Sequence, residues 1–232
     1  MSEIKTFVFF DLETTGLPKF EENRTRITEF CAVAVRADHI GLQTAQKCKL
    51  PRVQSKLSLC FNPARAICPQ ATKLTGLSNE LLEHQAHFSS QTLNVIKNWL
   101  DVNEKPICLV AHNGNEFDFP ILRAEIENTG ENLPEDILCL DSIIAFKEID
   151  TLEGGAVINQ PNEIKIRKID TSYNLGHVFK RRLSKRPLNA HGAEGDVNML
   201  LACAADYGQK FVKFANGNST KFSQMPIMKP KF

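Results

Sequence analysis

Apolar and polar positions divide the chain into short β-favouring runs and longer stretches with helical spacing. The predicted strands are residues 6–10, 27–35, 57–61, 106–110 and 137–140. The predicted helices are residues 69–74, 90–100, 119–128, 172–183 and 192–214. In the second helix Leu93, Ile96 and Leu100 fall on one face, behind a serine cap. Strands that come first and helices that alternate with later strands predict an α/β fold with a mixed sheet covered by helices.

Two segments lack this periodicity. Residues 150–170 contain adjacent glycines, a proline and the basic residues Lys165, Arg167 and Lys168, so we expect a mobile loop. The last segment, 216–232, is predicted to be an irregular C-terminal tail. Because 232 residues suit one compact core, we expect a single domain over residues 1–215 followed by that tail.

Composition narrows the class of protein. The seven cysteines are an odd number without C-x-x-C spacing, which argues against a disulfide or zinc framework and for a reducing compartment. No leader pattern and no apolar stretch of about eighteen residues occurs, so we expect a soluble intracellular protein of the nucleus or cytoplasm, with no membrane partner. The formal charge of +1 neither supports nor excludes a nucleic-acid partner.

Charged residues directly follow the first apolar run. Asp11 and Glu13 lie two positions apart, so the alternation of a strand points both side chains to one face. Two carboxylates behind a buried run are costly unless they reach water, a partner or a divalent cation. Taken alone, the pair fits an ordinary strand that enters a turn equally well.

Further candidate residues lie where helices begin. Asp118 falls between the strand at 106–110 and a helix begun near Pro120, where it could bind a ligand or cap the helix. In HGAEGD at 191–196, His191 precedes the last helix and Asp196 falls in its early turn. This pattern indicates a base beside an anchored ligand, although a solvated histidine and a favourable helix-dipole interaction explain either residue alone.

The motifs together resemble those of the DEDDh exonuclease family. FDLETTGLP at 10–18, LVAHNGNEFDFPIL at 109–122 and HGAEGDVNMLL at 191–201 contain the five signature residues in order. The connecting segments PRVQSKLSLC, TKLTGLS and PICLVAHNG are similar to the TREX group of three-prime repair exonucleases. The resemblance covers nearly the whole chain, and three ordered motifs argue against an accidental match.

This resemblance implies a ribonuclease H-like mixed sheet flanked by helices. It also implies a 3′-to-5′ exonuclease that releases nucleoside monophosphates from single-stranded or mismatched DNA ends. Two Mg²⁺ ions, or Mn²⁺ in their place, would stabilise the attacking and leaving oxygens. In the family scheme Asp11 bridges both ions, Glu13 and Asp196 serve the ion that holds the attacking water, and Asp118 serves the other. His191 would remove the proton of the water.

The same resemblance implies contacts with the end of the substrate. Glu13 and Thr14 would meet the terminal sugar, and Leu17 and Leu74 would wedge between the last bases. Core packing is the alternative for the two leucines. Phe117 occupies a position where relatives carry an aromatic residue.

Basic clusters are the candidates for contacts with phosphate. The loop residues Lys165, Arg167 and Lys168 form one cluster, and Lys180, Arg181 and Arg182 form a second. An ordinary solvated face is the alternative, and it is stronger for the second cluster. Glu116 is acidic where one branch of the group carries a basic residue, which puts a DNA contact there in doubt.

Relatives also form dimers through an edge strand, so we expect a homodimer, with residues 27–35 or 57–61 at the interface. Two other functions stay open. An exonuclease that trims RNA would use the same carboxylates and histidine, while the TREX-like segments favour DNA. A catalytically silent nucleic-acid-binding or scaffold protein is disfavoured by the intact signature residues. A zinc enzyme is disfavoured because no H-E-x-x-H or clustered Cys/His spacing occurs.

Overall fold

Six strands form the centre of the molecule in the computed structural model, which describes residues 2–42, 50–154, 172–185 and 192–231. They are β1 (Thr6–Thr14), β2 (Ile27–Arg36), β3 (Ser55–Cys60), β4 (Ile107–Ala111), β5 (Leu138–Asp141) and β6 (Thr220–Lys221). The strand order is β3-β2-β1-β4-β5-β6. β1, β4 and β5 are parallel, while β2 is antiparallel to β1 and β3, and β6 to β5. The predicted mixed sheet is therefore confirmed.

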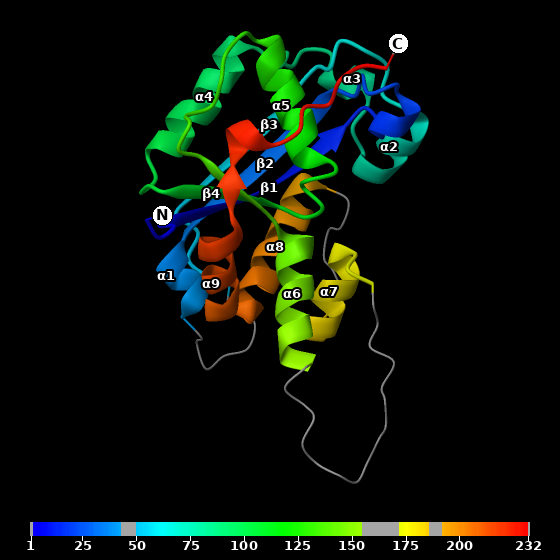
Figure 1. Cartoon of the computed structure of the whole chain (residues 1–232). Helices are drawn as coiled ribbons and strands as arrows, with labels where there is room; N and C mark the ends of the chain where they lie inside the picture. The colour runs from blue at the N-terminus through cyan, green and yellow to red at the C-terminus, as the bar shows by residue number, and fades with distance from the viewer. Residues whose placement is uncertain (1, 43–49, 155–171, 186–191, 232) are drawn as a thin grey trace, which may run out of the picture.

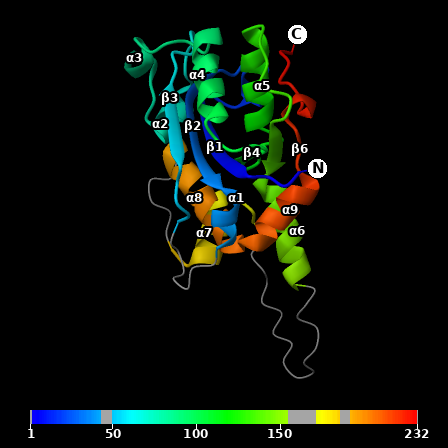
Figure 2. The same ribbon diagram turned by 90° about the vertical axis from the view of Figure 1, so that its left-hand side faces the viewer.

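Helices cover both faces of this sheet (Figures 1 and 2). One face carries α4 (Ser90–Asp101) and α5 (Asp118–Asn128), and the other carries α6 (Ser142–Gly154), α8 (Ala193–Tyr207) and α9 (Gln209–Asn218). α7 (Leu175–Leu183) lies beside α8. The short helices are α1 (Ala37–Gly41), α2 (Pro69–Thr75) and α3 (Asn79–Leu82), with 3₁₀ turns η1 (Pro18–Phe20) and η2 (Phe222–Gln224). Among the described helices, none is long and apolar enough to cross a membrane.

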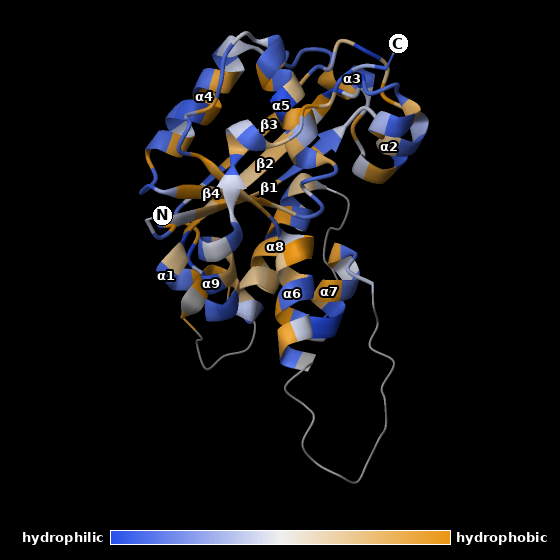
Figure 3. Cartoon of the chain, in the orientation of Figure 1, coloured by the Kyte–Doolittle hydropathy of each residue, from blue (hydrophilic) through white to orange (hydrophobic). Residues whose placement is uncertain are grey.

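Alternation along β1 supplies two hydrophobic cores. Phe7 and Phe9 point to the core beneath α6, α8 and α9, whereas Val8, Phe10 and Leu12 point to the core beneath α4 and α5. Figure 3 shows that hydrophobic residues are concentrated on the central strands and on parts of the helices that cover them. Because successive side chains of a strand alternate between faces, the odd-numbered residues of β1 face α8.

The last part of the chain departs from the prediction in two ways. The helix expected over 192–214 is two helices, because Gly208 adopts φ 58° and ψ −132°, a conformation outside the helical region that ends α8 and begins α9. The expected irregular tail instead completes α9 and contributes β6 and η2, with Phe222 and Met225 buried. Two apolar residues three positions apart are too few to form a periodic pattern, so the sequence did not predict that this C-terminal segment is ordered. The division into a domain over 1–215 and a tail over 216–232 stays a prediction.

Helix α6 is absent from the helices predicted from the sequence. Residues 150–154, which were expected to begin a loop, form its last turn. The helix begins at Ser142, directly after β5, without turn residues in between. Its first turn is supported from within the strand, because the Ile143 N–H donates to Asp141 Oδ1 at 2.9 Å. Residues 155–170 of the predicted loop lie outside the described residues. The six described cysteines are all free, as their spacing predicted.

Gly114 is closely packed, and its replacement by alanine should destabilise the protein by about 1–3 kcal/mol. An added Cβ would lie 2.7 Å from Phe119 Cε2 and 2.8 Å from Ala111 Cβ. Phe119 is fully buried and Ala111 belongs to β4, so neither atom can easily move. Gly217→Ala is the matched control, because a Cβ at this helical position has no neighbour within 4 Å. Urea unfolding that gives Gly114→Ala the stability of the wild type would contradict the expectation.

Candidate active site

Asp11 and Glu13 project from β1 on the face that packs against α8. They follow Phe7 and Phe9 at odd positions, so each carboxylate takes the place of an apolar core residue. β1 continues to Thr14, which places both residues within the strand rather than at its end, as the sequence had suggested. Asp196 comes from the early part of α8. Ligand oxygens of Asp11, Glu13 and Asp196, all partly buried, lie within 4.8 Å of one another.

Asp118 reaches the same region from the next strand of the sheet. β4 runs parallel to β1, so the carboxyl ends of both strands lie at one edge, and Asp118 follows β4 after a short loop. It is 2% exposed at the first position of α5, and the N-cap position is taken by Phe117. Backbone N–H groups of Leu12 and of Asp118 itself bond to the carboxylate. Oδ1, however, is buried without a hydrogen-bond partner.

The electrostatics of these carboxylates show how they affect one another. Burial, followed by the charges of Asp118, Glu13 and Asp196, raises the pKa of Asp11 well above its usual range. Burial, then the charge of Asp196, raises the pKa of Glu13 to about 8. The pKa of Asp118 is also raised to about 8 by burial, although the two backbone N–H bonds oppose the rise. Each charged form is therefore unfavourable in this pocket unless a cation accompanies it.

This arrangement fits a divalent metal ion. Three carboxylates converge, and the buried Oδ1 of Asp118 lacks the partner that a buried oxygen normally has. Carboxylate oxygens are the ligands that hard cations such as Mg²⁺ prefer. A bound cation would favour the charged carboxylates and would give the buried oxygen a partner. The four carboxylates predicted from separate segments are thus brought to one edge of the sheet.

Asp141, which the sequence did not single out, holds the loop in front of Asp118. Its Oδ1 accepts the Asn113 N–H at 3.1 Å, and its Oδ2 accepts the Asn115 N–H at 3.1 Å. Asn113 adopts φ 62°, an unfavourable value for a residue with a side chain. Asp141 is 5% exposed at the carboxyl end of β5. The only signal in the sequence was an aspartate at the end of an apolar run.

Asp141→Asn should weaken metal binding and activity by about 10–100-fold, as loss of a group that orients a metal ligand typically does. The asparagine amide presents one acceptor oxygen in place of two, so one loop N–H loses its partner. The expected signature is a shift of the activation curve to higher metal concentration. Ser142→Ala, one residue along, is the matched control because Ser142 pairs with His112 instead. An unchanged activation curve for Asp141→Asn would exclude a positioning role.

Glu29 is a second residue that the sequence analysis did not use. It lies opposite Glu13 in the β1–β2 pairing, and its charge contributes to the raised pKa of Glu13. Hydrogen bonds from the Ala193 backbone and the Ser58 side chain partly offset the effect of burial on its own pKa. Ala193 is the first residue of α8, so Glu29 links the sheet to the helix that carries Asp196. Its signal was a lone charge within an apolar strand.

The residues predicted to contact the end of the substrate differ in how exposed they are. Leu17 and Leu74 are 48% and 51% exposed, which excludes the core-packing alternative for both. Their segments are connected, because the N–H of Cys68, the N-cap of α2, donates to Thr15 O at 2.8 Å. Thr14 is buried, and its hydroxyl donates to Gly16 O. Phe117 is partly buried against the core beneath α4 and α5.

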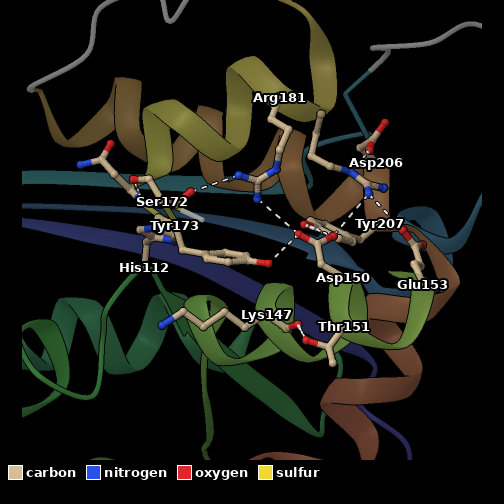
Figure 4. A network of polar contacts seen from close by, with 12 residues as sticks. His112, Lys147, Asp150, Thr151, Glu153, Ser172, Tyr173, Arg181, Asp206 and Tyr207 are labelled. Atoms are coloured by element: carbon tan, nitrogen blue, oxygen red, sulfur yellow. Dashed lines mark hydrogen bonds and ion pairs between the residues drawn. The ribbon is translucent and has the colours of Figure 1, made fainter. Parts of the chain in front are cut away.

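The basic cluster on α7 has a structural role (Figure 4). Arg181 donates to Ser172 O at 3.1 Å and to Asp150 Oδ2 at 3.3 Å. Arg182 donates to Asp206 Oδ2 at 2.7 Å and to Glu153 Oε2 at 3.3 Å. These pairs join α7 to α6 and α8 and give both arginines partners within the protein, while contacts of this cluster with phosphate stay a prediction. His191, Lys165, Arg167 and Lys168 lie outside the described residues.

The mixed sheet flanked by helices is a ribonuclease H-like fold. Among solved structures, E. coli exonuclease I in complex with a dA16 oligonucleotide superposes with a TM-score of 0.68 at 18% identity, covering 92% of this chain and 44% of that chain. The chain thus spans less than half of that enzyme. The family model described as Exonuclease (RNase_T) matches residues 8–203, and the chain belongs to this family.

Within the family, the similarity to three-prime repair exonucleases is confirmed. Mouse three prime repair exonuclease 2 is 37% identical over 226 residues, which cover 97% of this chain and 92% of the relative. Human three-prime repair exonuclease 1 is 34% identical over 236 residues, which cover 97% of this chain and 71% of the relative. The chain is accordingly an exonuclease, a hydrolase of phosphodiester bonds.

Proposed function

We propose that this protein removes nucleotides one at a time from the 3′ ends of DNA, with two Mg²⁺ ions held by Asp11, Glu13, Asp118 and Asp196. The observation that carries the proposal is the convergence of these carboxylates beside a buried Asp118 oxygen without a partner. The relatives are named three-prime repair exonucleases, which supports hydrolysis from the 3′ end. Mn²⁺ is the alternative metal.

The chemistry needs positive charge at the point where the phosphodiester is attacked. Hydrolysis builds negative charge on the attacking and leaving oxygens, and two bound divalent ions would stabilise both. The protein side chains supply the negative pocket that holds those ions, and β1, α5 and α8 fix the directions of the carboxylates. Partial burial keeps the number of competing waters low, which strengthens each electrostatic interaction.

His191 completes the proposal as the general base. It precedes α8, the helix that carries Asp196, by two residues in the sequence. A histidine with a pKa near about 6.5 can accept the proton of an attacking water at neutral pH. The cations in the carboxylate pocket would oppose any rise of that pKa.

DNA is the proposed substrate, as single-stranded or mismatched 3′ ends, and RNA is the alternative. Matched DNA and RNA oligonucleotides of one sequence, incubated separately with the protein and Mg²⁺, test this choice. Chromatography of the products should show nucleoside 5′-monophosphates released much faster from DNA. A strong preference for RNA would overturn the choice of substrate, and tight end-binding without any product would favour a silent binding protein.

A homodimer also stays a prediction, and the sheet restricts how it can form. β2 is paired on both sides, by β1 and β3, so the candidate interface at 27–35 was wrong. Among the strands of the described residues, β3 lies at the edge of the sheet and has a paired strand on one side only. The candidate interface is therefore β3 alone.

A further inference from the structure

A short turn close in the sequence to Asp11 and Glu13 exposes an aromatic side chain that the proposed chemistry does not use. η1 follows β1, and Phe20 at its end is 77% exposed. The Phe20 N–H donates to Leu17 O at 2.9 Å, which closes a 3₁₀-type turn. Leu17, the residue that precedes η1, is exposed as well. A single exposed hydrophobic residue is ordinary by itself, so the neighbours of Phe20 decide whether this surface can bind a ligand.

Contacts of Glu21, the residue after Phe20, stabilise the turn. Glu21 is half of an ion pair with Arg65 at 3.3 Å, and its side chain is only 10% exposed. Glu21 Oε2 also accepts hydrogen bonds from the Thr15 and Thr25 hydroxyls, at 2.9 and 2.6 Å. Phe20 is therefore displayed on a backbone that is already ordered, so binding to it would cost little conformational entropy.

Basic residues lie in η1 itself and on the C-terminal segment that is bonded to the residues after it. Lys19 Nζ lies 4.7 Å from the centre of the Phe20 ring. The segment that contains Lys229 and Lys231 runs beside the turn, because Asn23 Nδ2 donates to Lys229 O at 3.0 Å and the Lys231 N–H donates to Glu22 O at 2.9 Å. We call this region the η1 surface; it consists of Lys19, Phe20, Lys229 and Lys231. All four residues are exposed.

We propose that the η1 surface binds substrate DNA outside the nucleotide that is removed, with Phe20 stacked on a base and the three lysines beside phosphates. Aromatic faces among basic residues suit a DNA strand, because every base can stack and every phosphate attracts a cation. The formal charge of the whole chain is only +1, so this local excess of basic residues is not a general property of its surface. The inference rests on the proposed function and extends its substrate site.

The first test compares Phe20→Ala with the wild type on two substrates. One is a single-stranded DNA 20-mer, and the other is the p-nitrophenyl ester of thymidine 5′-monophosphate, which has no second nucleotide. KM for the 20-mer should rise about tenfold, the loss expected for one stacked base, while kcat and turnover of the ester stay unchanged. Phe20→Trp should keep the low KM. Val102→Ala, at a position 75% exposed at the end of α4, is the matched control.

The second test removes charge. In Lys229→Gln/Lys231→Gln, the slope of log KM against log salt for the 20-mer should fall by about 0.7 for each phosphate that the variant no longer binds. Lys213→Gln, an exposed lysine on α9, should leave the slope unchanged. Equal KM values for wild type and Phe20→Ala, together with an unchanged salt slope, would overturn the inference.

Failure of the proposed function would look different. In that case the wild type itself would hydrolyse neither the ester nor the 20-mer. The η1 surface would then be tested by fluorescence anisotropy with the labelled 20-mer, in which equal affinities of wild type and Phe20→Ala overturn it.

Discussion

Asp118→Asn is expected to slow metal-dependent DNA hydrolysis by about a thousandfold or more. The substitution keeps the shape of the side chain and removes one negative charge from the pocket, so a cation loses several kcal/mol of stabilisation, and each 1.36 kcal/mol corresponds to about tenfold in rate. Steady-state release of nucleotides from a single-stranded oligonucleotide at saturating Mg²⁺ measures the effect.

The stability of the variant separates a catalytic defect from a folding defect. Burial raises the pKa of the Asp118 carboxyl to about 8, so its charged form is unfavourable in the folded protein without metal. Metal-free Asp118→Asn should consequently be at least as stable as the wild type at neutral pH. Asp136→Asn, at a position 56% exposed before β5, is the matched control and should keep full activity. Near-normal activity of Asp118→Asn would exclude Asp118 as a ligand of the metal.

The stability of the folded protein is expected to depend strongly on pH and on bound metal. The folded pKa values of Glu13 and Asp118 are both raised to about 8, from ordinary values of 4.5 and 3.8. Groups with raised folded pKa contribute stability that is fully present below the ordinary values and is lost as pH rises through about 8. The melting temperature of the metal-free protein should therefore fall across this window, and Glu13→Gln/Asp118→Asn should flatten the fall.

Divalent metal should reverse this loss at neutral pH. A metal concentration about a hundred times Kd should raise Tm by roughly 5–10 °C, because the ion binds the folded state alone. The same addition should have little effect on Glu13→Gln/Asp118→Asn. A wild-type Tm that is the same with Mg²⁺, with Mn²⁺ and with chelator would contradict a metal site at these carboxylates.

Much of the sheet could be predicted from the sequence because its strands are short apolar runs with clear ends. The run that contains Phe7, Phe9 and Phe10 marks β1, and the carboxylates directly after it mark the site. Strong local signals of this kind do not depend on the rest of the fold. The convergence of Asp11, Glu13 and Asp196 followed from the resemblance of three ordered motifs, and the geometry agrees with it.

Features that depend on tertiary contacts could not be predicted in the same way. The start of α6 is fixed by Asp141, a residue of the preceding strand, so no separate cap or turn appears in the sequence. Gly208 divides the last helix by its backbone conformation alone. The pairs that Arg181 and Arg182 form could not be predicted, because their partners Asp150, Glu153 and Asp206 come from two other helices. A local sequence pattern cannot reveal ion pairs between residues of different helices.

The activity proposed for this protein is metal-dependent removal of nucleotides from the 3′ end of DNA. The most direct test is a time course with a 5′-labelled single-stranded DNA oligonucleotide, resolved at single-nucleotide length, with Mg²⁺ and with chelator. We expect a ladder that shortens one nucleotide at a time from the 3′ end with Mg²⁺ and intact DNA with chelator. Release of the 5′ label as the first product, internal cleavage, or undiminished degradation in chelator would contradict it.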